Sequence, residues 1–138
     1  MSLTQERLKW LLNYDPLTGV FTRKNLTQHC WTNVGEVIGY KNRGYLSTRI
    51  DGKTYRLHRL AWLYMTWELP EKELDHKNRI RHDNAWSNLR ESNRLLNAQN
   101  RMAPSTNNRT GFLGVRPSKN GKFRARITVN KKRIELGE

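Results

Sequence analysis

Apolar residues recur with helical spacing near the start of the chain. In residues 4–13, three leucines fall on one helical face: Leu8, Leu11 and Leu12. Thr4 is of the residue type that caps a helix N-terminus. We therefore predict a short helix over residues 4–13, a turn at residues 15–19 with its proline and glycine, and a strand over residues 19–22. Residues 24–35 are polar and irregular, which indicates a loop.

Alternation replaces helical spacing between Gly44 and His58. Two alternating runs, residues 45–50 and 53–57, flank the pair Asp51-Gly52, which predicts a β-hairpin. Residues 58–67 return to helical spacing, with one apolar face made of Leu57, Leu60, Ala61, Tyr64 and Met65. We expect this helix to be the core helix and Pro70 to end it. We also expect four tryptophans to be core residues: Trp10, Trp31, Trp62 and Trp86.

The last part of the chain shows two further patterns. Ser92 is expected to open a helix that continues to about Arg101, and residues 104–108 have the composition of a linker. Residues 122–129 alternate between apolar and mostly basic side chains, and residues 133–136 form a further predicted strand. These patterns predict an α+β fold in three parts: residues 1–70 with a helix and hairpin, residues 71–103 with the chemistry considered below, and a basic β segment at 104–138.

The charge balance narrows the range of partners. Lysine and arginine number 26 and aspartate and glutamate number 12, giving a formal net charge of +14. Residues 101–138 contain ten basic and two acidic residues, a net charge of +8. A strongly basic chain favours a polyanionic partner, because phosphate neutralisation releases condensed counterions. Nucleic acid is the favoured partner; the alternative is that the chain is a basic ribosome-associated protein or merely a soluble basic protein.

Cysteine usage and hydrophobicity exclude other classes. The single cysteine, Cys30, excludes an intrachain disulfide and a thiolate zinc cluster. We find no secretory signal and no run of the roughly 18 apolar residues that a membrane span requires. These features favour a cytoplasmic protein with no membrane partner.

Four polar residues have the chemistry of phosphodiester hydrolysis. Such a reaction needs a base to deprotonate water and a cation to neutralise charge on the phosphate oxygens. His76 suits the first task, and the side-chain oxygens of Asp75 and Asn97 suit a hard divalent cation. Taken singly, each of these residues is more often an ordinary surface or turn residue, as Asn88 also is. Adjacent residues on a strand point to opposite faces, so Asp75 and His76 need a bulge or a strand end to reach one phosphate.

The run from Leu74 to Arg101 (LDHKNRIRHDNAWSNLRESNRLLNAQNR) resembles the H-N-H endonucleases of phages and mobile introns, and the upstream run YRLHRLAWLYMTWELP resembles the segment that precedes the motif. The similarity extends over about residues 1–101. It implies a β-hairpin followed by a metal-binding helix. The chain departs from the family in the loop, with Arg79 and Ile80 where glycine and an acidic residue are common.

The resemblance also implies roles for individual residues. His76 is the general base, and Asn88 is the central asparagine that bonds across the loop; we group both as catalytic. Asp75 and Asn97 bind one Mg²⁺ or Mn²⁺ ion per active site. Arg101, one turn beyond Asn97, holds a phosphate. His58 is interpreted as structural, and no role is assigned to His29, Cys30 or His82.

The C-terminal run TGFLGVRPSKNGKFRARITVNKKRIELGE resembles the start of the ethylene-response-factor type of DNA-binding domain, which presents three strands to the major groove. The chain reaches Glu138 where the backing helix of that domain would follow, so residues 104–138 are expected to be an incomplete version; the alternatives are that the strands pack elsewhere or that they are mobile without DNA. Arginines on such strands can read guanine edges. The candidate DNA contacts are Arg116, Lys122, Arg124, Arg126 and Arg133.

Together these observations predict a divalent-metal-dependent DNA endonuclease of the phage homing type. Its partner is double-stranded DNA, it needs no small-molecule cofactor, and it acts in the cytoplasm of a bacterial host. The alternative is a DNA-binding protein without catalysis that keeps the H-N-H unit as a scaffold, and an RNA substrate remains open. Retention of Asp75, His76 and Asn97 together favours the enzyme.

Overall fold

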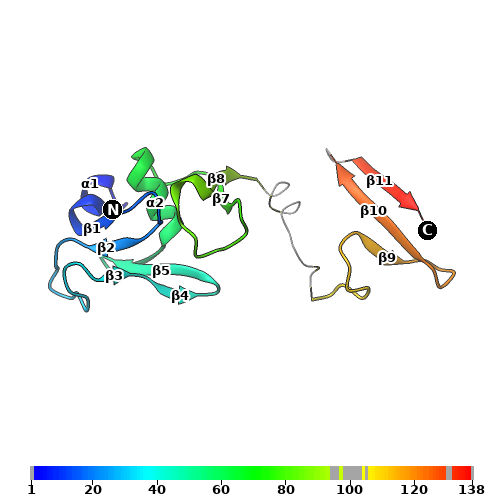
Figure 1. Ribbon diagram of the computed structural model, residues 1–138, viewed down its shortest axis with the longest axis horizontal. Helices are drawn as coiled ribbons and strands as arrows, with labels where there is room; N and C mark the ends of the chain where they lie inside the picture. Colours follow the sequence, from blue (N-terminus) through cyan, green and yellow to red (C-terminus); the bar gives the residue numbers. More distant parts are fainter. Residues whose placement is uncertain (1, 94–96, 98–103, 105, 130–131, 138) are drawn as a thin grey trace. The chain divides into compact units, whose positions relative to one another are not determined.

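The computed structural model describes residues 2–93, 97, 104, 106–129 and 132–137. The chain divides into two compact units, residues 1–97 and residues 98–138. Figure 1 shows α1 and α2 in the first unit and the strands β9, β10 and β11 in the second. No helix among the described residues is both long and apolar enough to cross a membrane.

The first unit begins with the predicted helix, α1 (Gln5–Leu11). The Thr4 hydroxyl caps it by accepting a hydrogen bond from the backbone N–H of Arg7 at 3.2 Å. The helix is shorter than predicted, because Leu12 already belongs to a strand. β1 (Leu12–Tyr14), β2 (Phe21–Arg23) and β3 (Val37–Ile38) form an antiparallel sheet in the order β1-β2-β3. The leucines of the predicted face are buried.

A second antiparallel sheet confirms the predicted hairpin. Its strands are β4 (Tyr40–Asn42), β5 (Tyr45–Ile50) and β6 (Lys53–Arg56), in the order β4-β5-β6. Asp51 and Gly52 join β5 to β6 with φ angles of 46° and 79°, which is the geometry of a type I′ turn. The chain then enters α2 directly.

The helix α2 (Leu57–Thr66) supplies much of the core through Leu57, Leu60, Ala61 and Leu63. The prediction that Pro70 ends it is wrong: the helix ends earlier, where Trp67 adopts a left-handed conformation with φ 74°. Met65 is 37% exposed and is not part of the buried face. α1 packs on α2, and the side-chain amide of Gln5 donates to the carbonyl of Tyr64 at 2.7 Å.

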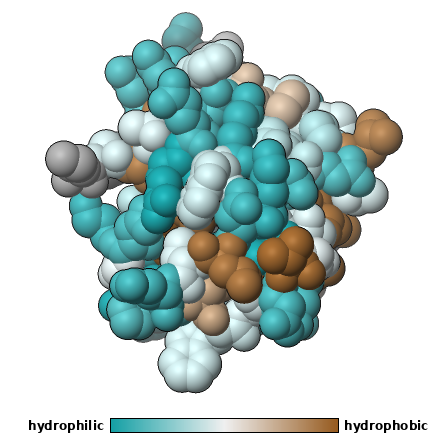
Figure 2. Space-filling model, turned by 90° about the vertical axis from the view of Figure 1, so that its left-hand side faces the viewer, coloured by the Kyte–Doolittle hydropathy of each residue, from teal (hydrophilic) through white to brown (hydrophobic). Residues whose placement is uncertain are grey.

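The tryptophans divide between core and surface. Trp62 and Trp86 pack together with ring centroids 5.1 Å apart, and both are partly buried. Trp31 is 99% exposed and Trp10 47%, so the expectation that they are core residues is wrong. Figure 2 shows a largely hydrophilic face on which apolar residues form only small groups.

The last elements of the first unit form the hairpin of the predicted motif. β7 (Glu73–His76) pairs with β8 (Leu89–Ser92), and a short 3₁₀ helix, η1 (Trp86–Asn88), lies in their connection. Ser92 ends β8 instead of opening a helix, because it pairs with Glu73. Of the helix predicted beyond it, Asn97 is described and is helical, and its N–H bonds to the carbonyl of Asn93 at 3.0 Å. The other residues from 94 to 101 lie outside the described part.

The second unit is a small antiparallel sheet. β9 (Val115–Pro117), β10 (Phe123–Val129) and β11 (Lys132–Gly137) lie in the order β11-β10-β9, and the strands predicted over residues 122–129 and 133–136 are confirmed. None of its described residues is buried, and apolar side chains such as Phe123 (59% exposed) and Leu136 (61%) face solvent.

Candidate active site

Asp75 and His76 lie at the end of β7 and point to opposite faces of the hairpin. The β7–β8 pairing is regular, with Asp75 opposite Arg90 and His76 opposite Leu89. No bulge brings the two side chains together, and His76 is the last residue of the strand. The His76 ring is turned toward the core and is 4% exposed. Asp75 is on the other side and is only partly buried.

His76 is held by a polar contact and two rings. Its Nε2 lies 3.0 Å from Oδ1 of the buried Asn84. The His58 ring meets it edge-on at 5.1 Å between centroids, and the Tyr45 ring lies at 6.1 Å. Burial, followed by the nearby His76 and two arginines, lowers the pKa of His58 to about 3. His58 therefore stays neutral near pH 7, and its buried Nδ1 has no hydrogen-bond partner among the described residues.

The end of β1 and the turn that follows it pack against Asn84 and its neighbours. The Tyr14 hydroxyl donates to the carbonyl of Asn84 at 2.7 Å, and the N–H of Trp86 donates to the carbonyl of Pro16 at 2.9 Å. Gly19 has a φ of +74°, and a Cβ there would lie 2.2 Å from the backbone of Asn84. Only glycine fits this approach. The N-terminal region thus fixes the residue that holds His76.

Asn88 ties the connection between the two strands together. Its side-chain N–H donates to the Asn78 Oδ1 at 2.9 Å and to the Asp83 carbonyl at 2.8 Å, and its Oδ1 accepts from the Asn78 backbone N–H at 2.9 Å. Arg79, where the H-N-H family commonly has glycine, adopts a φ of 65°. The left-handed turn is therefore kept without glycine. Asn78 was not singled out in the sequence because its contacts depend on this loop closing.

Asp75 is engaged by an arginine that sequence patterns did not identify. Arg90 donates to Asp75 Oδ2 from Nε at 3.1 Å and from Nη2 at 2.8 Å. The two residues face each other directly across the hairpin, so only the strand register reveals the pair. A metal ion at Asp75 has to share this carboxylate with Arg90 or displace the guanidinium.

Asn97 meets β7 through a different residue, Glu73. The Asn97 amide donates to Glu73 Oε2, and its Oδ1 accepts from the Ser92 hydroxyl at 2.7 Å. Glu73 and Asp75 are alternate residues of one strand and share a face. The signal for Glu73 was therefore present in the sequence as a second carboxylate two residues before Asp75.

The oxygen-bearing side chains on this face have suitable chemistry for a hard cation. The candidate ligands are two carboxylates and one amide: Glu73, Asp75 and Asn97. In the described part of the chain, no three His, Cys, Asp or Glu side chains converge as a metal site. These donors therefore suit a divalent ion only if the side-chain oxygen of Asn97 is one of its ligands.

The predicted DNA contacts of the second unit gather on one small sheet. Arg116 lies directly opposite Arg124, and Arg126 and Arg133 lie on β10 and β11 near Glu135. Opposed like charges destabilise a sheet unless an anion lies between them. Lys122 immediately precedes β10. Arg101 lies outside the described residues.

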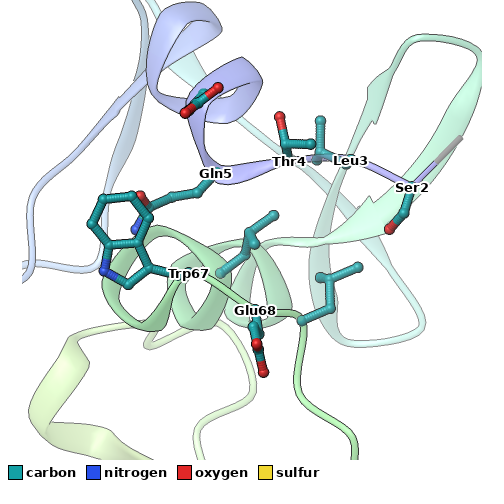
Figure 3. A pocket seen from close by; sticks show the side chains of 9 residues that line it. Ser2, Leu3, Thr4, Gln5, Trp67 and Glu68 are labelled. Atoms are coloured by element: carbon teal, nitrogen blue, oxygen red, sulfur yellow. The ribbon is translucent and has the colours of Figure 1, made fainter.

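Two cavities lined by described residues of the first unit lie away from the hairpin. One, of about 460 Å³, lies between the start of α1 and the end of α2 (Figure 3) and has Glu6 and Glu68 in its wall, which does not suit a polyanion. The other, of about 740 Å³, is lined by residues including Arg23, Cys30 and Trp31. Neither contains any of the residues predicted from the motif.

Comparison with known proteins gives one similarity. No curated protein and no solved structure matches the chain. The resemblance of residues 110–138 to an ethylene-response-factor domain is not supported by any comparison. Residues 55–99, however, match the family model described as HNH endonuclease, a shorter stretch than the predicted residues 1–101. Over that region the chain is similar to a family of endonucleases.

Proposed function

We propose that this protein is a divalent-metal-dependent endonuclease that hydrolyses phosphodiester bonds of double-stranded DNA. The observation that supports it most is the position of His76 at the end of β7, fixed by Asn84 within a loop that Asn88 closes, inside the stretch similar to HNH endonucleases. A proposed phage homing role rests on the resemblance of residues 74–101 alone.

His76 acts as the general base in this proposal. The contact of Nε2 with Asn84 Oδ1 orients the imidazole, and in this proposal the ring takes the proton of the attacking water. Asn88 holds the loop that carries Asn84, and so acts on the position of the base. Asp75 and Asn97 would hold Mg²⁺ or Mn²⁺, which supplies neutralisation of charge on the phosphate oxygens.

Supercoiled plasmid incubated with and without Mg²⁺ tests the proposal. We expect open-circular or linear product only with the metal. His76→Ala should lower the rate by about 10²–10⁴-fold, the usual contribution of a general base, while DNA affinity is retained. His82→Ala is the matched control, because His82 is an exposed histidine of the same loop. Equal rates for wild type and His76→Ala would remove His76 from the chemistry.

A DNA-binding protein without catalysis is the second candidate. The contacts of Asp75 with Arg90 and of Asn97 with Ser92 favour it, because these side chains are already satisfied within the protein, as in a scaffold. Plasmid that stays supercoiled in Mg²⁺ and in Mn²⁺, while the protein still binds it, would establish this candidate.

The second unit is proposed to bind the same duplex through the basic side chains of its sheet. The support is the shared location of Arg116 and Arg124 on neighbouring strands and the excess of positive charge in residues 101–138. Deletion of residues 105–138 measures its contribution to DNA affinity.

A further inference from the structure

Two arginines from separate segments meet on one tyrosine ring beside the candidate active site. Tyr45 is the first residue of β5. The guanidinium of Arg56, at the end of β6, lies 4.3 Å from its ring centroid, and that of Arg81, in the β7–β8 connection, lies 5.2 Å from it. We call this group the Tyr45 cluster: Tyr45, Arg56 and Arg81.

The positive charge of the Tyr45 cluster is uncompensated within the described part of the chain. Neither guanidinium forms an ion pair with a carboxylate among the described residues, whereas Arg7 and Arg90 each do. Arg56 and Arg81 are both exposed. The face of an aromatic ring attracts a guanidinium but leaves its N–H groups available as donors. Two like charges on one ring repel each other, and an anion between them would remove that repulsion.

The Tyr45 cluster is also held in place. A Cβ at Gly44, whose φ is +83°, would lie 3.5 Å from both Cδ and Nη1 of Arg81, so the Arg81 side chain runs along the β4–β5 turn. The Tyr45 ring also contacts the buried His58 at 5.3 Å and His76 at 6.1 Å between centroids. The donors are therefore positioned before any ligand arrives, and the ring that holds them lies beside the proposed base.

We propose that Arg56 and Arg81, held on the Tyr45 ring, form the seat of one backbone phosphate of duplex DNA next to His76. Guanidinium groups bind phosphate oxygens through paired N–H donors, and two exposed guanidinium groups on one ring offer such donors from two segments of the chain. The seat positions the strand. Its placement beside the reaction depends on the proposed function, but its binding of DNA does not.

The test is a salt titration of duplex binding in EDTA, with wild type, Arg56→Gln, Arg81→Gln and the double variant. Loss of one phosphate contact lowers the slope of log K against log salt by about 0.9, which corresponds to roughly 8-fold weaker binding at ~0.1 M salt. We expect that change in the double variant and smaller changes in the single variants. Lys9→Gln is the control, because Lys9 also lies on aromatic rings, those of Tyr64 and Trp67 near the other end of α2.

The outcomes separate this inference from the proposed function. An unchanged slope in the double variant, with thermal stability retained, overturns the seat even if His76→Ala abolishes nicking. A lower slope in a protein that never nicks supports the seat and rejects the nuclease. Full-length duplex RNA of the same sequence is titrated in parallel, and a slope change with RNA but not with DNA overturns the proposal. If the double variant unfolds, it is replaced by Arg56→Lys with Arg81→Lys, which keeps the charge but loses the paired donors. We expect this variant to bind DNA more weakly with an unchanged slope. Undiminished affinity would count against the seat.

Discussion

The two units of the chain bear similar chemistry on very different supports. In residues 1–97 the functional side chains rest on a buried core, and even the loop residue Asn84 is 1% exposed. In the described part of residues 98–138, a three-stranded sheet with a register shift between Ala125 and Arg126 has no buried residue. Hydrogen-bonded strands therefore form in both units, but among the described residues only the first unit has a core of buried apolar side chains, and burial of apolar surface is the main source of folding free energy.

This difference indicates a division of tasks. A reaction requires side chains held within fractions of an ångström, and that precision comes from packing such as the contact of Gly19 with Asn84. Binding to phosphates requires charge of the right sign and spacing, which an exposed sheet with Arg116 opposite Arg124 supplies. We expect the first unit to control rate and the second to control affinity.

Deleting residues 105–138 is the strongest test of this division. Loss of four phosphate contacts would reduce the salt slope by roughly 3 to 4 and weaken binding by three to four orders of magnitude at ~0.1 M salt. The truncated protein should still nick DNA at low salt, with less site preference, because β7 and β8 are intact. Fluorescence anisotropy on one duplex measures the full and the truncated protein. An equal slope would make the second unit a solvated appendage.

Gly19→Ala should destabilise the first unit by about 2–4 kcal/mol, through strain and overlap with Asn84 and Ala85. Gly35→Ala is the matched control, because Gly35 has a similar φ of +86° but a Cβ there would meet no described atom within 4 Å. It should lose only the conformational part, about 1 kcal/mol. Urea unfolding followed by tryptophan fluorescence gives both values. Equal losses would show that the contact with Asn84 is unimportant.

Acid should weaken the first unit through His58. Its folded-state pKa of about 3 lies below the ordinary 6.5, so the unfolded chain binds the proton more tightly. Stability is therefore complete above pH 6.5 and falls by up to about 1.4 kcal/mol per pH unit as the pH decreases toward 3. His58→Leu should have a flatter profile in urea unfolding at several pH values. The same steepness in both proteins would assign the effect to other groups.

The smallest expected effect concerns the metal. Arg90→Gln removes a positive charge from Asp75, so Mn²⁺ should bind roughly 5-fold more tightly, a screened Coulomb effect of about 1 kcal/mol. Calorimetric titration of the DNA-free protein measures it, with Lys72→Gln, at a more exposed ion pair, as control. Weaker Mn²⁺ binding in Arg90→Gln would mean that the arginine holds Asp75 in a binding orientation.

Local patterns predicted most of the elements, because turns and alternation are encoded by neighbouring residues. The hairpin at Asp51-Gly52 and the cap at Thr4 are examples. Contacts between segments distant in the sequence could not be predicted from these patterns. Nothing near Tyr14 indicates that its hydroxyl meets Asn84, 70 residues later, and Arg90 becomes the partner of Asp75 only through strand register. Element ends were also missed where backbone conformation decided them, as at Trp67.

The contact of Gly19 with Asn84 bears on how such a motif can be transplanted. The stretch similar to HNH endonucleases begins at residue 55, yet its loop packs against the Tyr14 hydroxyl and the backbone of Gly19. A segment cut at the borders of sequence similarity would therefore lack these contacts in a new host protein. For this chain, the segment to transfer is the whole of residues 1–97, and a chimera that contains less of the chain would need another surface to pack against Asn84.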